Sequence, residues 1–385
     1  MTAPNDRFRI LSVDGGGIRG LVPALVLAEL ERRLQEGTGE DARVADYFHM
    51  FAGTSTGGLV ALSLTVPDRP SRPDRPLISA QTLAEFYRAD GPRIFRRSLW
   101  QKLKTAWGWI GPKYSLGPLE EAVANRVGTG TTLADALREL IVVAYDMTDR
   151  DPYFFKRWRA RVELQRQLAG EGSGIQETAP AGEVRNRPLV DAALATSAAP
   201  TYFPSHEVDR HALVDGGVFA ANPTIAAVVE ALKRRSDEPH DLIPDDLLVV
   251  SIGTGLHETR FTQAEVSAWG KLGWIVPQEG EPPILATVLG GSSDGVDHWA
   301  QTLLNEPSTP NLAREDIGRG PRFFRLQVPL DPPIPLDDAG TPALAALESA
   351  ANRLIADRED ELSDITARLL RAGPIPPDPS PSSRA

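Results

Sequence analysis

The sequence predicts an α/β fold with a mainly parallel central sheet, and three observations support that prediction. Short apolar runs of strand length alternate with longer segments of helical periodicity along much of the chain, which is typical of parallel α/β proteins. The first two of these runs end in glycine-rich loops that lead into helices. With 385 residues, of which 41% are hydrophobic, the chain can bury a sizeable core in one large domain or two ordinary ones.

Two strand-loop-helix units open the chain. A strand over Phe8–Val13 runs into a glycine loop, and a helix is predicted over Leu21–Leu34 because Pro23 suits a first turn and apolar residues recur with helical spacing. Residues 44–53 approach a second turn, and Gly58–Val66 is predicted to form the helix behind it. The elements expected after these are a loop at 67–76, a helix at 79–90, strands at 140–145 and 153–158, a loop at 165–187, a helix at 188–200, a strand at 211–214, a helix at 224–233, a strand at 247–252, a helix around 284, a strand at 323–328 and a helix at 342–370.

This order of elements predicts three parts of the chain. A main α/β domain is expected over residues 5–335, and a helical extension over 340–371 is expected to pack on it. Residues 373–385 are rich in proline and serine and have too few apolar side chains to be held in a core. We therefore expect a disordered tail there.

Composition excludes several classes of function. The net charge of -11 argues against a nucleic-acid polymer as partner, because phosphate binding relies on clustered lysine and arginine. The chain has no cysteine, which excludes disulfides, thiolate catalysis and cysteine-based metal sites, and no metal site is predicted. No apolar signal segment is present, and no run approaches the ~18 apolar residues that span a bilayer. A cytoplasmic protein is expected.

A basic segment rich in tryptophan interrupts this acidic chain at residues 93–114, and it includes Trp100, Trp107 and Trp109. Such a segment suits an anionic membrane surface or a lid. A helical hairpin that packs its tryptophans inward explains the same pattern, and the sequence does not decide between these interpretations.

The stretch from Gly53 to Gly58 is predicted to be a nucleophile elbow. Ser55 stands between Gly53 and Gly57, at the point where an apolar run meets a helix. A sharp strand-to-helix turn needs small neighbours on both sides and exposes the hydroxyl of the residue at its corner. Chance supplies this pattern often in a chain with 33 glycines, so its context must decide.

The earlier glycine loop, Asp14 to Gly20, fits two uses. The glycines at 15, 17 and 20 match the dinucleotide fingerprint, but no convincing strand carries the acidic residue that would hold a ribose about 20 residues later. The other use is an oxyanion hole, in which backbone N–H groups at a helix start face a developing negative charge. We favour the second use and expect no cofactor.

A serine nucleophile needs a base, and two kinds are available. None of the six histidines lies in a motif, although His257 or His298 could complete a Ser-His-Asp triad with Asp215. Asp215 itself follows an apolar strand and precedes Gly216 and Gly217. Since a carboxylate of ordinary pKa ~3.9 is a weak base, a Ser/Asp dyad would require a desolvated site.

Taken together, these motifs resemble the patatin-like phospholipase family over about residues 8–255. The segments that carry the resemblance are Asp14-Gly15-Gly16-Gly17-Ile18-Arg19-Gly20, Gly53-Thr54-Ser55-Thr56-Gly57-Gly58 and Asp215-Gly216-Gly217, with Lys113-Tyr114, Ser197-Ala198-Ala199-Pro200, Asn222-Pro223 and Ser251-Ile252-Gly253-Thr254-Gly255 in support.

The resemblance implies a three-layer α/β/α sandwich in which residues 5–335 form the catalytic domain. It further implies that Ser55 is the nucleophile, that Asp215 is its base without a histidine, and that Gly15, Gly16 and Gly17 supply the oxyanion donors. The implied reaction is hydrolysis of carboxylic esters in membrane phospholipids through an acyl-enzyme, with transient contact to the membrane surface.

The same resemblance allows two further interpretations of the function. The chain is similar in size and layout to bacterial patatin-like effectors of anti-phage defence that a cyclic nucleotide activates, although we identify no nucleotide motif. A non-catalytic lipid-binding or storage protein on the same scaffold is the remaining alternative. Oligomeric state is not predicted.

Overall fold

An eight-stranded mixed sheet lies at the centre of the protein. The computed structural model describes residues 8–69, 71–96, 111–170, 185–233, 242–256, 261–276, 282–305 and 320–376. The sheet order is β10-β9-β1-β2-β5-β8-β7, and β6 pairs with β5. The strands are β1 (Phe8–Val13), β2 (Met50–Thr54), β5 (Glu139–Asp146), β6 (Asp151–Lys156), β7 (His206–Val208), β8 (His211–Asp215), β9 (Leu247–Ile252) and β10 (Phe323–Leu326).

The first five strands in this order, from β10 to β5, are parallel, whereas β6, β7 and β8 run antiparallel to their neighbours. The mainly parallel α/β sheet is therefore confirmed. A separate small hairpin joins β3 (Pro67–Asp68) to β4 (Arg72–Pro76), in a region expected to be loop.

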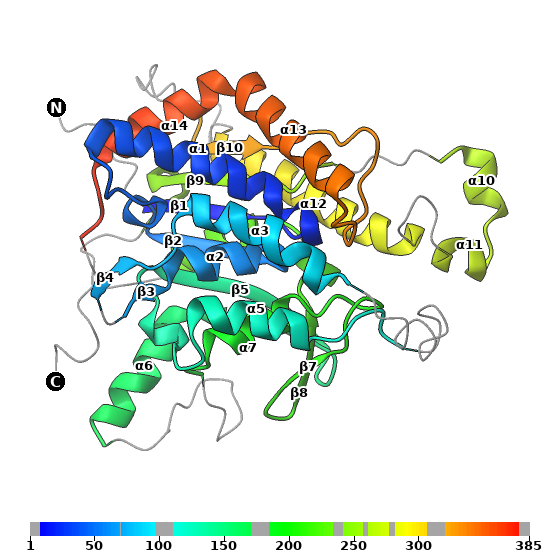
Figure 1. Ribbon diagram of the computed structural model, residues 1–385, viewed down its shortest axis with the longest axis horizontal. Helices are drawn as coiled ribbons and strands as arrows, with labels where there is room; N and C mark the ends of the chain where they lie inside the picture. Colours follow the sequence, from blue (N-terminus) through cyan, green and yellow to red (C-terminus); the bar gives the residue numbers. More distant parts are fainter. Residues whose placement is uncertain are drawn as a thin grey trace.

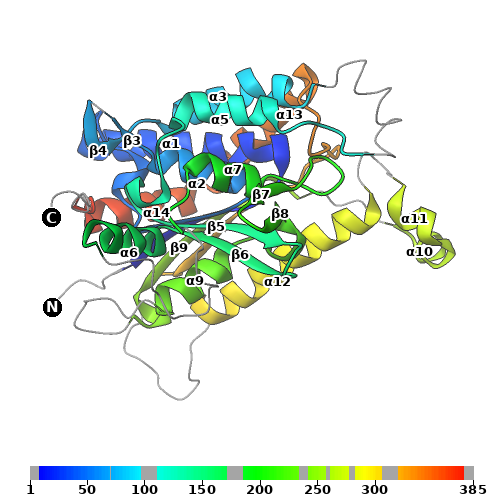
Figure 2. The same cartoon turned by 90° about the horizontal axis from the view of Figure 1, so that it is seen from below.

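Helices cover both faces of the sheet and complete a three-layer α/β/α sandwich (Figures 1 and 2). Because alternate residues of a strand point to opposite faces of the sheet, Ile10 of β1 belongs to one hydrophobic core and Leu11 to the other. The larger core includes α1 (Leu21–Thr38), α2 (Thr56–Thr65), α3 (Ala80–Ile94), α5 (Gly117–Val127), α7 (Leu189–Thr196), α13 (Thr341–Asp357) and α14 (Glu359–Ala372). The smaller core lies under α9 (Thr224–Lys233) and α12 (Pro283–Asn305). The other helices are α6 (Arg157–Leu168), α8 (Gly217–Ala220), α10 (Gln263–Ala268) and α11 (Lys271–Ile275).

Several predicted elements differ from the structure. The helix α5 was not expected, and α6 occupies residues assigned to the end of a strand and to the start of a loop. The long helix expected over 342–370 is two helices, because Arg358 leaves the helical conformation at φ -114° and ψ 27°. Both helices pack against α1, and their apolar residues, among them Leu347 and Ile365, belong to the larger core.

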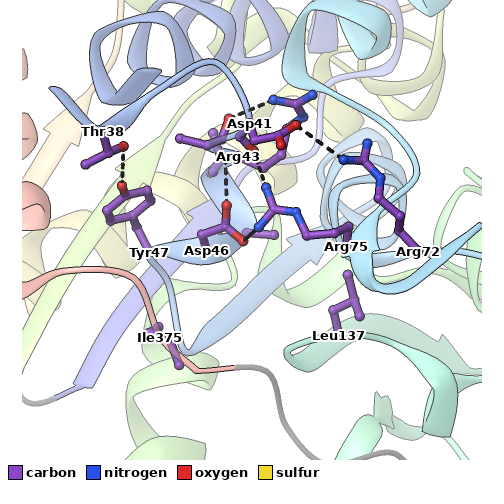
Figure 3. Close-up of polar contacts among 12 residues, drawn as sticks. Thr38, Asp41, Arg43, Asp46, Tyr47, Arg72, Arg75, Leu137 and Ile375 are labelled. Atoms are coloured by element: carbon purple, nitrogen blue, oxygen red, sulfur yellow. Dashed lines mark hydrogen bonds and ion pairs between the residues drawn. The ribbon is translucent and has the colours of Figure 1, made fainter. Parts of the chain in front are cut away.

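A disordered tail was expected from residue 373 onward, but residues 373–376 are held by hydrogen bonds. The N–H of Ile375 donates to the carbonyl of Asp46 at 2.7 Å, and Arg138 donates to the carbonyl of Ile375 at 2.9 Å. Figure 3 shows Ile375 beside Asp46 and Tyr47, where Arg75 also donates to the Asp46 carboxylate at 2.8 Å. Polar backbone groups thus hold residues 373–376 where apolar side chains could not, and residues 377–385 lie outside the described part.

Of the helices in the described ranges, none combines the length and the apolar character needed to cross a bilayer.

Candidate active site

Ser55 forms the corner between β2 and α2. Its φ of 55° and ψ of -126° place a non-glycine residue in a strained region, and its N–H donates to the Thr196 hydroxyl at 2.8 Å. The neighbouring glycines are required, because a Cβ on Gly57 would lie 2.0 Å from the carbonyl oxygen of Val13 and one on Gly53 would lie 2.1 Å from that of Gly57. The turn has the strand-to-helix geometry of a nucleophile elbow.

Asp215 reaches Ser55 because β2 and β8 occupy the same edge of β5. Thr54 at the end of β2 pairs with Val143, and Asp215 at the end of β8 pairs with Ala144, the next residue of β5. Since β8 runs antiparallel, the carboxyl ends of the two strands meet end to end. The topology therefore brings Ser55 and Asp215 together although they lie far apart in the sequence.

The carboxylate of Asp215 is buried and accepts two hydrogen bonds. One comes from the Ser55 hydroxyl, and the other from the N–H of Gly217 at 2.7 Å. Burial raises the pKa of Asp215 from 3.8 to about 6, although both hydrogen bonds oppose that rise. A Cβ on Gly216 would lie 2.4 Å from the carbonyl oxygen of Val143 on β5, so the chain passes β5 closely at this point. Desolvation has thus made this carboxylate a stronger base than an ordinary aspartate.

The glycine loop after β1 lies against Ser55. A Cβ on Gly15 would lie 3.3 Å from the Cβ of Ser55. Of the three glycines predicted as oxyanion donors, Gly15 is the one whose N–H already has an acceptor, the carbonyl of Ala221 at 2.9 Å. Among the described residues, the N–H groups of Gly16 and Gly17 have no hydrogen-bond partner. These two groups remain available to an anion.

The rest of the glycine motif fixes the shape of this loop. Gly17 has φ +57°, and a Cβ there would lie 2.2 Å from the carbonyl oxygen of Leu336, so only glycine suits the position. The side chain of Arg19 is buried and donates weakly to the carbonyl of Gly16 at 3.4 Å. Gly20 ends the short 3-10 turn and packs against α2 and α3.

Asp14 fixes the start of the glycine loop to β10 and α12. Its carboxylate accepts hydrogen bonds from Arg325 of β10 at 3.0 and 2.5 Å and from Ser293 of α12 at 3.2 Å. Burial raises the pKa of Asp14, and the neighbouring Arg325 guanidinium opposes that rise. The sequence did not identify Arg325 or Ser293, although an arginine within the apolar Phe323–Leu326 strand was a usable signal.

One cavity of about 250 Å³ is lined by residues 14–17, Ser55 and Asp215, and most of its remaining wall is apolar. Phe95, Tyr114 and Phe203 form a cluster of rings whose centroids lie 5.7 to 6.2 Å apart, and Phe95 and Phe203 face the cavity. The apolar residues that line it include Ile94, Leu119, Tyr202, Leu285, Leu289 and Leu336. A hydrocarbon chain fits such walls better than a sugar or a nucleotide does.

Comparison with known proteins identifies the family. The model described as "Patatin-like phospholipase" matches residues 11–228. Patatin-like protein 2 of Arabidopsis thaliana is 36% identical over 313 residues, which cover 75% of this chain and 70% of that protein. The chain belongs to the patatin-like phospholipase family. Patatin-like protein 1 of Oryza sativa subsp. indica is 34% identical over 321 residues, covering 78% and 72% of the two chains.

Membership of the patatin-like phospholipase family indicates a lipid acyl hydrolase, which is a carboxylic ester hydrolase in the broad sense. The solved structure of VipD from Legionella pneumophila aligns over 91% of this chain and 67% of its own at 14% identity, with a TM-score of 0.35. That score is too low to support an argument about the fold.

The histidines give little support to a triad in this family member. None of the four within the described ranges, at positions 49, 206, 211 and 298, lines the cavity. His298 is exposed on α12, and His211 is hydrogen-bonded to Asp146. His257 lies outside the described part, as do Trp100, Trp107 and Trp109 of the basic segment at residues 93–114.

Proposed function

We propose that this patatin-like protein hydrolyses the carboxylic esters of membrane phospholipids through a Ser55/Asp215 dyad. One observation carries the proposal: the hydroxyl of Ser55, on a strained elbow, donates to a buried carboxylate whose pKa lies at about 6. A base with a pKa close to neutral is ionised at pH 7 and still accepts a proton in the transition state.

The first half-reaction transfers the acyl group to the enzyme. Asp215 takes the proton of the Ser55 hydroxyl while Oγ attacks the acyl carbonyl carbon. The N–H groups of Gly16 and Gly17 stabilise the oxyanion of the tetrahedral intermediate, an effect worth about 3 kcal/mol for one donor. The ester C–O bond then breaks, and Asp215 returns its proton to the departing alcohol oxygen. The alcohol product is a lysophospholipid.

The second half-reaction repeats these steps with water. Asp215 removes a proton from the water while the water oxygen attacks the acyl carbon. The bond between that carbon and the Ser55 oxygen then breaks, and the serine oxygen takes the proton from Asp215. The product is a free fatty acid. The apolar residues of the cavity, such as Leu285 and Phe203, support a fatty acyl chain as the group that is bound.

Labelling with a fluorophosphonate tests the dyad. We expect the wild-type protein to be labelled and to release fatty acid from phosphatidylcholine, and we expect Ser55→Ala to do neither. Asp215→Asn should lower kcat by at least about 1000-fold. Turnover by Ser55→Ala would refute the mechanism, whereas an unlabelled wild type that still binds lipid would favour a storage protein.

The triad alternative has its own test. If a histidine were the base in a triad with Asp215, His257→Ala or His298→Ala would lose activity as Asp215→Asn does, because the aspartate of a triad orients the histidine. Retention of activity in both histidine variants would exclude the triad and leave the dyad.

We also propose a cytoplasmic enzyme that contacts the membrane surface only while it acts. Activation by a cyclic nucleotide in anti-phage defence rests on the resemblance of size and layout alone and stays a prediction. Full lipase activity without any member of a panel of cyclic di- and trinucleotides would contradict it.

A further inference from the structure

Exposed apolar side chains gather on one part of this protein. They lie on α10, α11 and the outer face of α12, and the most exposed is Leu272, with 68% of its surface accessible. We call this surface the apolar ridge. It consists of Val266, Leu272, Ile275, Val276, Ile284, Val288, Trp299 and Leu303.

The α12 members of the ridge form a single stripe. At 100° per residue, Ile284, Val288, Trp299 and Leu303 fall within a sector of about 100°. A surface helix of a water-soluble domain normally turns such a stripe toward the core. Here α12 exposes it, and burial of Val296, Ala300 and Leu304 uses a different side of the helix.

The two short helices that extend the ridge are ordered by their own contacts. The ring of Trp269 lies edge to face with those of Phe261 and Trp274, at 4.7 and 5.2 Å between centroids. A capping box between Thr262 and Glu265 starts α10. These contacts involve the aromatic side chains, whereas the aliphatic side chains stay exposed to solvent. Both views show that α10 and α11 lie away from the three layers of the sandwich (Figures 1 and 2).

The ridge is continuous with the candidate active site. Leu285 and Leu289 line the cavity that contains Ser55, and each follows directly after a ridge residue, Ile284 and Val288. One face of α12 therefore forms the cavity wall while the adjacent face is the ridge. An acyl chain that leaves an apolar phase at the ridge would meet apolar atoms on its way to the cavity.

The charges around the ridge indicate what kind of surface it fits. Residues 283–293 carry no charged side chain, and α10 and α11 carry only Glu265 and Lys271, which have opposite signs. Such a surface has little electrostatic attraction for anionic headgroups, but it gains from inserting apolar side chains among acyl chains. Trp299 suits the boundary between headgroups and hydrocarbon.

We propose that the apolar ridge is the face that docks this protein on a zwitterionic lipid bilayer and delivers phospholipid to the cavity. The inference rests on the proposed function, because a soluble substrate would not need this face. A second copy of the chain is the competing occupant of the ridge, and the test distinguishes the two.

The test compares two double variants. Leu272→Asp/Ile275→Asp changes the ridge at residues that are 68% and 52% exposed, so the fold should tolerate it. Leu77→Asp/Leu168→Asp is the matched control, since these residues are 46% and 58% exposed and belong to the opposite end of the molecule, near β4 and on α6. Both variants remove two aliphatic side chains and add two carboxylates.

The measurements are flotation with phosphatidylcholine vesicles, fatty acid release from those vesicles and hydrolysis of a soluble short-chain ester. We expect the ridge variant to lose at least about 100-fold in vesicle affinity and a similar factor in vesicle hydrolysis, while its soluble-ester rate stays within about twofold of wild type. The control variant should match wild type in all three. Wild-type flotation should persist when salt rises from about 0.1 to about 0.5 M, because the contact is apolar.

Three results would overturn the docking surface: vesicle binding by the ridge variant equal to wild type, loss of wild-type binding in high salt, or a wild-type dimer that the ridge variant converts to monomer without loss of vesicle binding. None of these removes the dyad. If the wild type floats but neither cleaves the soluble ester nor reacts with a fluorophosphonate, the proposed function fails, and the flotation result still decides the role of the ridge.

Discussion

Replacing Asp215 with asparagine should stabilise this protein while abolishing its activity. The carboxylate is buried, and burial raises its pKa from 3.8 to about 6. Above pH 6 the folded protein must hold a desolvated charge that the unfolded chain exposes to water. At 1.36 kcal/mol per pKa unit, the ionised carboxylate costs about 3 kcal/mol of folding free energy.

The sign follows from proton binding. Between pH 3.8 and about 6 the folded state holds the Asp215 proton more tightly than the unfolded state does. The contribution of Asp215 to stability is therefore least unfavourable below pH 4, and stability is lost as the pH rises through about 6. Asparagine has no charge to desolvate, and its amide can still accept from Gly217 N–H and face Ser55.

Urea unfolding of wild type and Asp215→Asn at a series of pH values measures this difference. We expect the variant to be more stable by about 1 to 3 kcal/mol at pH 8 and the gap to close toward pH 4. Asp294→Asn is the control, since this carboxylate lies on the same cavity but is exposed, and it should change stability little at either pH. A variant less stable than wild type at pH 8, or a gap independent of pH, would refute the reasoning.

Three further predictions concern the same end of the sheet. The kcat/KM of wild type on a soluble ester should rise with pH through about 6, because Asp215 must be ionised to act as a base; a flat profile between pH 5 and pH 8 would contradict this. Arg325→Met should lower the free energy of unfolding by about 3 kcal/mol in a urea titration, since it leaves the buried Asp14 without its cation, and adding Asp14→Asn should restore part of the loss; unaltered stability in the single variant would argue against the anchor. Gly57→Ala should lower the thermal midpoint by several degrees because of the contact with the Val13 carbonyl, while Gly130→Ala, which has open space around it, should not; equal midpoints would show that the elbow tolerates a Cβ.

The sequence predicted the parts of the fold that depend on local patterns. Strands β1 and β9 and helix α9 lie where their apolar patterns placed them, because each is buried against a core that its own periodicity reveals. The break at Arg358 and the anchoring of Ile375 were not predictable in this way. Both depend on partners distant in sequence, α1 for the two helices and Asp46 for the tail.

In the candidate site, too, local motifs were predictable and contacts between distant segments were not. Ser55 and the glycine loop carry their geometry in adjacent residues, so motifs identified them. The contact of Arg325 with Asp14 joins the two ends of the chain across β10, β9 and β1, and no local pattern reports it. The occupied N–H of Gly15 is similar, because its acceptor, Ala221, lies on a different segment of the chain.

The position of the dyad is set by strand register, which also explains its separation in the sequence. Thr54 and Asp215 pair with Val143 and Ala144, consecutive residues on one edge of β5. A slip of β8 by two residues would keep every side chain on its face but move Asp215 by about 7 Å, beyond hydrogen-bond reach of Ser55. The alternation of buried side chains alone therefore does not build the site, because the exact pairing of Asp215 with Ala144 is needed to bring the carboxylate to Ser55.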